Sequence, residues 1–197
     1  MAARDQDGGE LRTVQLAAAG DQAAQAALFE RYRAAAYAVA FRITGRVEDA
    51  LDVVQDSFIA AFTRLGEFQQ ESTFKTWLLR IVTNKALDAL RARRLRVTAP
   101  LQTEDGSPLP LPAQDASDPA ETRDLAEKIH AALEKLPPDQ RAVFALFAQA
   151  DMTYGQIAET LGIPVGTVMS RLYHARRRLL ALLSDLAPPG RPADREG

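Results

Sequence analysis

Four arginines stand close together in residues 153–180, whose sequence is TYGQIAETLGIPVGTVMSRLYHARRRLL. They are Arg171, Arg176, Arg177 and Arg178, and no acidic residue occurs from 165 to 180. Guanidinium groups bind phosphates and the edges of guanine, so this spacing favours a nucleic-acid-binding surface. A solvated basic face on an ordinary helical hairpin is the alternative interpretation.

The residues around these arginines predict two helices joined by a tight turn. Thr153 is a suitable N-cap for the first helix, and an apolar stripe follows it. Gly162 suits the left-handed conformation that ends a helix, and Pro164 suits the first position of the next one. Two helices joined in this way are typical of the DNA-binding helix-turn-helix.

The second helix of this pair has two distinct faces at 100° per residue. The residues that should be buried are Val168, Leu172, Ala175 and Leu179. The opposite face carries Gly166, Ser170, Tyr173 and Arg177, flanked by Met169 and His174. An outward face of this kind is where a recognition helix contacts base edges and phosphates.

Composition excludes several classes of function. The chain has 197 residues, of which 47% are hydrophobic and 25% charged, as in ordinary globular proteins. It contains no cysteine and only two histidines, His130 and His174, so we expect no metal site and no cofactor. No combination of nucleophile, base and oxyanion donor is present, and we expect that the protein is not an enzyme. The polar N-terminus and the lack of a long apolar run predict a cytoplasmic protein without membrane insertion.

The net charge of −2 hides segments of opposite sign. Residues 45–71 contain six acids and two arginines, whereas residues 72–96 contain seven basic residues and one acid. Residues 97–122 contain five acids and no basic residue. Basic segments suit phosphates, and acidic segments suit a basic protein partner or a linker that is kept off the DNA.

Hydrophobic periodicity predicts an all-α fold with two small helical domains. The expected helices span 10–44 with a break at Gly20-Asp21, then 47–65, 73–95, 120–136 and 139–148, followed by the helix-turn-helix. Residues 98–119 contain five of the eleven prolines and lack periodicity, which predicts a flexible, acidic linker. The expected domains are therefore 10–96 and 120–186, with the linker at 97–119 and a disordered tail at 187–197.

The helix over 47–65 has an apolar side and an acidic side. The expected core stripe is Leu51, Val54, Phe58, Ala61, Phe62 and Leu65. The other side carries Asp49, Asp52 and Asp56 at one-turn spacing, bordered by Val53, Gln55 and Ile59. This side is either a solvated acidic face or a surface that docks on a basic protein partner.

The helix over 73–95 carries aromatic, guanidinium and amide groups on one stripe. Phe74, Leu78, Ile81 and Val82 should face inward. The outward stripe consists of Trp77, Arg80, Asn84 and Arg91. These groups can stack on bases, hydrogen-bond their edges and hold phosphates. Alternatively, Trp77 is a core residue and the arginines are solvated.

Four motifs in this order resemble one family. They are DVVQDSFIAAF, STFKTWLLRIVTNKALDALRAR, LPPDQRAVFALF and YGQIAETLGIPVGTVMSRLYHARRRL, and together they cover roughly residues 10–185. The chain thus resembles a group 4, extracytoplasmic-function (ECF) sigma factor of bacterial RNA polymerase. The resemblance implies a sigma-2 and a sigma-4 domain without the sigma-3 domain that larger sigma factors have between them. It also implies a sigma factor that directs promoter-specific initiation of transcription.

The resemblance assigns roles to named residues. Leu51, Asp52, Gln55 and Asp56 would dock on the β′ coiled coil of core RNA polymerase. Trp77, Arg80, Asn84, Lys85 and Arg91, with the loop before them, would melt and read the −10 element. Thr167, Met169, Ser170, Arg171, Tyr173, His174 and Arg177 would read the −35 element as duplex. Family members usually carry a basic residue where Met169 stands and often where His174 stands, so this chain departs from the family there.

The implied partners are core RNA polymerase, through its β′ coiled coil and β flap, and promoter DNA. Family members are often held inactive by an anti-sigma factor, which is a further candidate partner. A stand-alone helix-turn-helix regulator is the main alternative, but it leaves the acidic and the tryptophan-bearing helices unexplained. A protein that only docks on another protein leaves the arginine-bearing helix unexplained.

Overall fold

The computed structural model describes residues 2–69, 72–97 and 119–184. These ranges contain eight α-helices, one short 3-10 helix and no strand, so the predicted all-α fold is confirmed. The expected linker and tail fall almost wholly on residues 98–118 and 185–197, which lie outside the described residues. No helix within the described ranges combines the length and apolar character needed to cross a bilayer.

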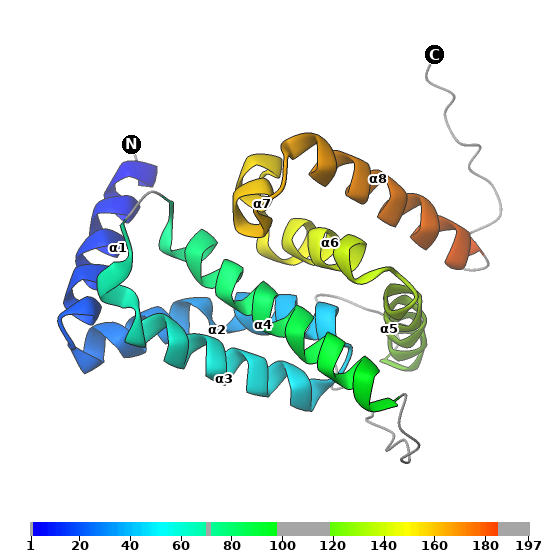
Figure 1. Cartoon of the computed structure of the whole chain (residues 1–197), viewed down its shortest axis with the longest axis horizontal. Helices are drawn as coiled ribbons and strands as arrows, with labels where there is room; N and C mark the ends of the chain where they lie inside the picture. Colours follow the sequence, from blue (N-terminus) through cyan, green and yellow to red (C-terminus); the bar gives the residue numbers. More distant parts are fainter. Residues whose placement is uncertain (1, 70–71, 98–118, 185–197) are drawn as a thin grey trace.

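The first four helices form the N-terminal unit. Helices α2 (Gln22–Thr44), α3 (Val47–Thr63) and α4 (Phe74–Val97) pack on one another, and α1 (Ala2–Ala18) crosses the end of α2 (Figure 1). The predicted break at Gly20-Asp21 is present, because Asp21 caps α2 by accepting a hydrogen bond from Ala24 N at 2.8 Å. Gly45 ends the same helix with φ +77°, a conformation that favours glycine.

The last four helices form the C-terminal unit. They are α5 (Pro119–Glu134), α6 (Pro138–Ala150), α7 (Tyr154–Leu161) and α8 (Val165–Leu182). Thr153 caps α7 in a capping box with Gln156, and Gly162 ends α7 with φ +63°, as predicted. Pro164 was expected at the first position of α8 but is its N-cap, because the tight turn needs an extended residue there, with φ −60° and ψ 147°.

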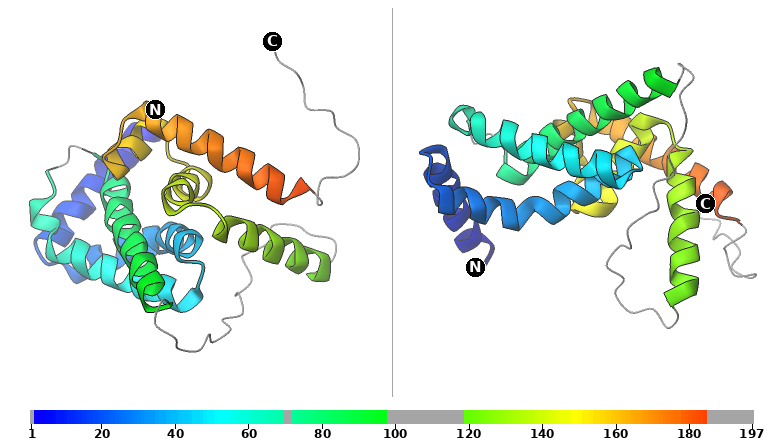
Figure 2. Two further views of the ribbon diagram at one scale, coloured as in Figure 1. Left: turned by 45° about the vertical axis from the view of Figure 1, so that its right-hand side comes forward. Right: turned by 90° about the horizontal axis from the view of Figure 1, so that it is seen from below.

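The two units share one hydrophobic core. A continuous cluster runs from Val14 in α1 to Leu172 in α8, and a smaller cluster joins α5 to α8. Helices α2 and α4 of the N-terminal unit pack against α6 and α7 of the C-terminal unit (Figures 1 and 2). We call this packing the inter-unit interface. The sequence predicted two separate units with a tether, and it did not predict this contact.

Two basic side chains make hydrogen bonds across the inter-unit interface. The buried Arg141 of α6 donates to Ile43 O at the end of α2, at 3.0 Å. The same guanidinium donates to Glu134 O and Leu136 O, so it also caps the end of α5. Lys75 of α4 donates to Ala150 O at the end of α6. Cations near helix C-termini are favourable because the carbonyl ends carry partial negative charge.

Some buried polar atoms of the four helices that meet between the units lack a hydrogen-bond partner, whereas others within the N-terminal unit are paired. Inside the N-terminal unit, Ser57 Oγ donates to Val53 O at 2.6 Å, and Thr44 Oγ1 donates to Ala40 O at 3.0 Å. The four helices of the interface carry buried atoms without a hydrogen-bond partner: Arg42 Nε, Thr83 Oγ1, Gln140 Oε1 and Thr160 Oγ1. Burial also lowers the pKa of the Arg42 guanidinium from its ordinary value.

Two residues of α3 lie on faces other than those predicted. Leu51 was placed in the core stripe, yet it is 53% exposed, and Val53 was placed beside the acids, yet it is 5% exposed. The reason is tertiary: α3 packs against both α2 and α4, so its buried arc shifts toward Ala50, Val53 and Ser57. The exposure of Leu51 adds an apolar side chain to the acidic face.

Candidate nucleic-acid interface

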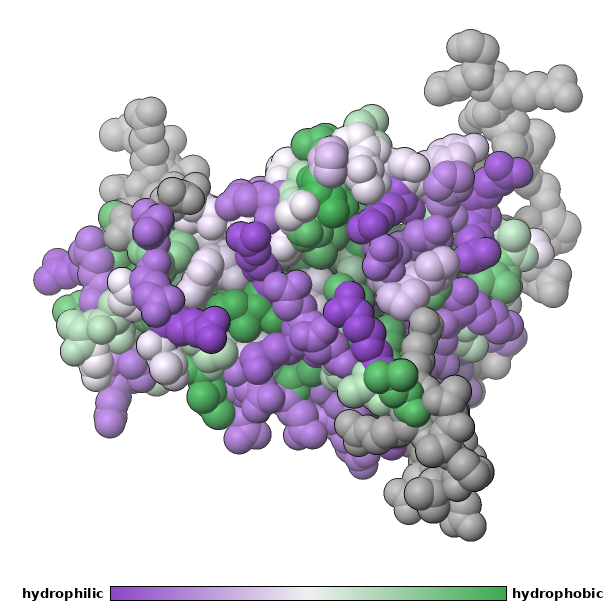
Figure 3. All heavy atoms as spheres, in the orientation of Figure 1, coloured by the Kyte–Doolittle hydropathy of each residue, from purple (hydrophilic) through white to green (hydrophobic). Residues whose placement is uncertain are grey.

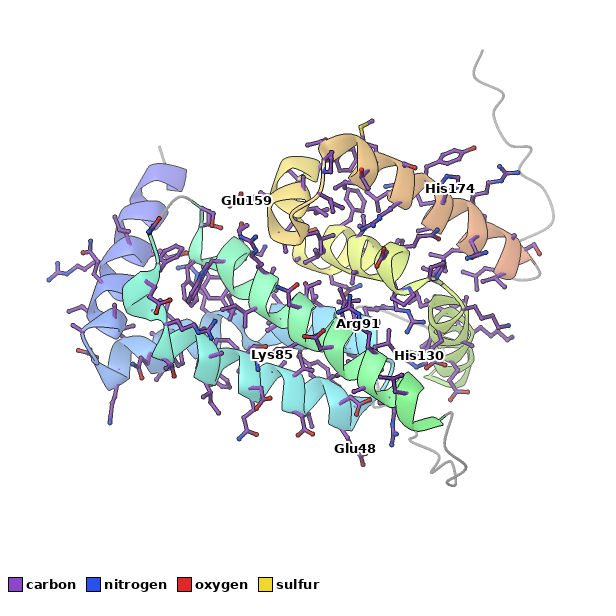
Figure 4. The ribbon with its side chains drawn as sticks, viewed as in Figure 1. Glu48, Lys85, Arg91, His130, Glu159 and His174 are labelled. Atoms are coloured by element: carbon purple, nitrogen blue, oxygen red, sulfur yellow. The ribbon has the colours of Figure 1, made fainter. Side chains whose placement is uncertain are left out.

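The C-terminal unit presents one complete helix-turn-helix. The inner face of α8 is buried at Val168, Leu172, Ala175 and Leu179, all as predicted, and it packs on α6 and α7. The opposite face is open to solvent. Its exposed residues are Gly166, Met169, Ser170, Tyr173, His174 and Arg177, while Thr167 is half-buried. Figure 4 shows His174 projecting from this face of α8.

The arginines of α8 are not equivalent. Arg171 forms an ion pair with Asp139 of α6 at 2.9 Å, and the Arg176 guanidinium lies 4.9 Å from the centre of the Phe147 ring. Both therefore help to hold α8 on α6. Arg177 and Arg178 are exposed, and no carboxylate of the described chain lies within ion-pair distance of them. Of the predicted arginine contacts, Arg177 is thus the one directly available to a phosphate or base.

The N-terminal unit presents a second candidate face on α4. Arg80, Asn84 and Arg91 are exposed along one side of the helix, as their spacing predicted. Trp77 is half-buried, with its ring 5.2 Å from that of Phe68 and 5.9 Å from that of Phe74. Trp77 therefore packs on the core, as one interpretation expected, and as a residue it remains partly exposed, as the other expected.

A small pocket lies beside Asn84, between α3 and α4. Its volume is about 270 Å³, and its lining is Ala60, Arg64, Ile81, Asn84, Lys85 and Asp88. The apolar Ala60 and Ile81 occur here with the basic Arg64 and Lys85 and with the carboxylate of Asp88, so the pocket can take a planar base beside a basic group. The sequence did not single out Ala60 or Arg64, because Ala60 lies on α3 and Arg64 directly follows α3, whereas Asn84 lies on α4. The available signal was that Ala60 and Arg64 are one helical turn apart.

The acidic face of α3 is exposed at Asp52 and Asp56 as predicted, whereas Asp49, also predicted there, is half-buried and pairs with Arg93 at 3.2 Å. Asp52, Gln55 and Asp56 are exposed together with Leu51 and with Ile59, which is 57% exposed. Lys85 lies 3.7 Å from Asp56, so the acidic face and the basic α4 face meet along one edge. Asp52 has no cation of the described chain within ion-pair distance. An exposed mixture of carboxylates and aliphatic groups is suited to a basic protein surface.

The three faces lie on different parts of the molecule. The α3 and α4 faces adjoin within the N-terminal unit, whereas the α8 face belongs to the C-terminal unit (Figure 4). The inter-unit interface is formed by other residues, so it leaves all three faces exposed. The described residues therefore present three separate exposed faces, an acidic one on α3 and basic ones on α4 and α8.

Comparisons with known proteins match both units. Residues 28–96 match the family model described as Sigma-70 region 2, and residues 126–179 match the model described as Sigma-70, region 4. The chain is 31% identical over 173 residues to the ECF RNA polymerase sigma factor SigW of Bacillus subtilis, covering 85% of this chain and 92% of SigW. It is 38% identical over 168 residues to the ECF RNA polymerase sigma factor SigE of Mycolicibacterium smegmatis, covering 82% of this chain but only 63% of SigE.

Solved structures show the same fold. The structure of CnrH in complex with the cytosolic domain of CnrY aligns with a TM-score of 0.65 and 30% identity, covering 89% of this chain and 97% of CnrH. The sigma factor RpoE in complex with the anti-sigma factor NepR, from Bartonella quintana, aligns with a TM-score of 0.64 and 29% identity. That alignment covers 76% of this chain and 90% of RpoE.

Proposed function

The chain belongs to the family of ECF RNA polymerase sigma factors, and on this premise we propose that it binds core RNA polymerase and directs transcription initiation at promoters that it selects itself. We place it in group 4, whose members lack a sigma-3 domain. The two matched regions, 28–96 and 126–179, leave too few residues between them for a further domain of ordinary size. This role requires no catalytic residue.

The acidic face of α3 is the proposed contact with core polymerase. Leu51, Asp52, Gln55 and Asp56 dock on the β′ coiled coil, and Ile59 extends the apolar part of the contact. Their joint exposure supports this assignment, because an apolar centre with charged neighbours is the usual composition of a docking surface. The β flap is the proposed polymerase contact of the C-terminal unit.

The α4 face is the proposed site for the −10 element. Arg80, Lys85 and Arg91 hold the backbone of the strand, and Asn84 hydrogen-bonds a base beside the pocket between α3 and α4. Trp77 offers its accessible edge to an unpaired base next to it. Binding of the unpaired strand offsets the cost of opening the duplex, so melting needs no hydrolysis of a nucleotide.

The outer face of α8 is the proposed site for the −35 element. Thr167, Met169, Ser170, Tyr173, His174 and Arg177 face the major groove. In this structure Arg171 is paired with Asp139. It can contact the −35 element only after this ion pair breaks. The expected charge of this face is therefore smaller than the count of four arginines suggested.

Simultaneous binding of both promoter elements requires the two units to separate. The elements lie about 25 base pairs apart, which is about 85 Å along the duplex at 3.4 Å per base pair. A compact body of this size has a radius of gyration of about 15 Å, so the closed arrangement cannot span that distance. The buried atoms without partners on α2, α4, α6 and α7 favour separation, because each would regain hydrogen bonds to water.

One observation carries the proposal. The chain has an exposed helix-turn-helix and also a second exposed face with tryptophan, arginine and asparagine beside an acidic docking face. A stand-alone helix-turn-helix regulator uses only the first of these. A sigma factor uses all three.

An anti-sigma factor and a cytoplasmic location belong to the same proposal. Two structural relatives were solved in complex, one with an anti-sigma factor and one with the cytosolic domain of CnrY. The exposed faces of α3 and α8 are the surfaces that an inhibitor of this chain would have to cover.

Run-off transcription tests the proposal directly. Purified core polymerase is assayed with and without this chain on a library of upstream regions from its own genome. We expect new, specific start sites that depend on the chain and share two upstream elements. Absence of initiation together with absence of binding to core polymerase would contradict the proposal and leave a stand-alone regulator.

A further inference from the structure

The outer face of α8 contains a line of exposed apolar side chains. Val165, Met169 and Tyr173 follow one another at four-residue spacing, and they are 45%, 54% and 59% exposed. This spacing places them along one side of the helix, and we call them the apolar stripe. In Figure 3 a hydrophobic area is visible where α7 leads into α8. Exposed apolar groups in a row mark a surface that a partner covers.

The first turns of α8 lack the side chains that read bases by paired hydrogen bonds. Residues 165–170 are VGTVMS and include no arginine, lysine, asparagine or glutamine. These four types make the bidentate contacts with guanine and adenine. The nearest arginine, Arg171, is paired with Asp139. The N-terminal end of a recognition helix is the part that contacts base edges. In α8 this end offers methyl and methylene groups and the hydroxyls of Thr167 and Ser170.

Gly166 lies next to the apolar stripe, and the fold itself does not require a glycine there. Its backbone is helical, and an added Cβ would meet no heavy atom within 4 Å. Glycine in a helix is less stable than alanine, so its presence is not explained by the helix. The absent side chain lets an external surface approach the helix backbone closely. This favours a groove of DNA over solvent as the neighbour of the apolar stripe.

We infer that Val165 and Met169 determine −35 specificity by contacting thymine methyl groups, an inference that rests on the proposed function. The thymine methyl is the distinctive apolar group in the major groove. The flexible Met169 side chain can adapt to its position. Four residues of helix rise about 6 Å, which is nearly two base-pair steps of about 3.4 Å. The two methyl groups therefore belong to base pairs one or two steps apart.

Replacement of thymine by deoxyuridine tests the inference, because it removes only the methyl group. Holoenzyme assembled from core polymerase and the full chain first selects its −35 element from randomised duplexes. Each thymine of that element is then replaced singly, and promoter binding is measured. We expect losses of about fourfold at each of two positions, the value for one buried methyl group.

Variants of the chain identify the residue behind each methyl effect. Met169→Ala should abolish the deoxyuridine effect at one position and Val165→Ala at the other. Leu180→Ala is the matched control, because Leu180 is also apolar and 74% exposed on α8 but lies about 16 Å further along the helix axis than Met169. Met169→Arg should move the preference at its position from thymine to guanine, the usual partner of arginine.

The outcomes separate this inference from the proposed function. Equal binding of thymine and deoxyuridine at every −35 position would overturn the inference, while initiation from the unsubstituted promoter would leave the proposed function intact. Deoxyuridine effects that persist in Met169→Ala and Val165→Ala would also overturn it. Complete absence of initiation would overturn both.

Discussion

The buried polar atoms of the N-terminal unit and those of the four helices that meet between the units include two kinds, some with a hydrogen-bond partner and some without. Within the unit, the buried hydroxyls of Ser57 and Thr44 donate to carbonyls of their own helices. On the helices of the interface, the hydroxyls of Thr83 and Thr160 are buried without partners. A buried polar atom without a partner costs about 1–3 kcal/mol, and exposure to water removes that cost.

The difference indicates which packing is permanent. The hydroxyls of Ser57 and Thr44 gain no hydrogen bond from exposure, so we expect the packing around them to persist in every state of the protein. We infer that the unpartnered atoms on α2, α4, α6 and α7 gain hydrogen bonds to water when the units separate, which offsets part of the cost of exposing apolar area. The proposed sigma factor needs this property, because the two DNA-binding faces must move apart to span a promoter.

A cross-link across the inter-unit interface should have the largest effect. The chain contains no cysteine, so two can be introduced at chosen positions. Lys75→Cys places a thiol on α4, and Asp151→Cys places one next to Ala150, whose carbonyl accepts the hydrogen bond from Lys75. A short bis-maleimide should then hold the units closed and reduce run-off transcription to background. Both single-cysteine variants, treated in the same way, should remain active. Full activity of the cross-linked protein would show that separation is not required.

Truncation in the core of the N-terminal unit should have the next largest effect, and on stability. Phe58→Ala removes a buried ring that packs edge-on against Phe29 at 4.8 Å, and should lower the free energy of unfolding by about 3–5 kcal/mol. Chemical denaturation followed by circular dichroism measures this. Ile59→Ala, at the exposed neighbouring position, is the control and should change stability by less than about 0.5 kcal/mol. Similar losses from both variants would contradict the assigned core.

Removal of a single buried hydroxyl should have the smallest effect on stability. The effect should be stabilising on α4 and α7 and destabilising at Thr44 on α2. Thr160→Val and Thr83→Val delete unpartnered hydroxyls, so each should stabilise the closed arrangement by about 1–3 kcal/mol and lower initiation several-fold. Small-angle scattering measures the compactness of these variants.

The same substitution inside the N-terminal unit is the matched control. Thr44→Val removes a hydroxyl that donates to Ala40 O, and it should destabilise the unit by about 1 kcal/mol. An equal loss of stability in all three valine variants would remove the proposed difference between interface and core.

Local rules accounted for most of the helix-turn-helix. Thr153 and Gly162 act as the caps that their types predicted, and the buried and exposed faces of α8 follow from helical periodicity alone. The same rules were wrong for Leu51 and Val53, because two neighbouring helices determine the buried arc of α3. Periodicity predicts which side of a helix packs on one neighbouring helix. It does not predict which side packs on a second neighbouring helix.

The sequence by itself determined the all-α fold, the order of the helices, the caps of α7 and the two faces of α8. These features depend on neighbours within about four positions of the chain. Only the tertiary structure decided that Arg171 is paired with Asp139, that Arg64 and Asn84 line one pocket, and that α2 and α4 pack on α6 and α7. Contacts between distant segments depend on how whole helices pack, and the spacing of residues along one helix carries no information about that packing.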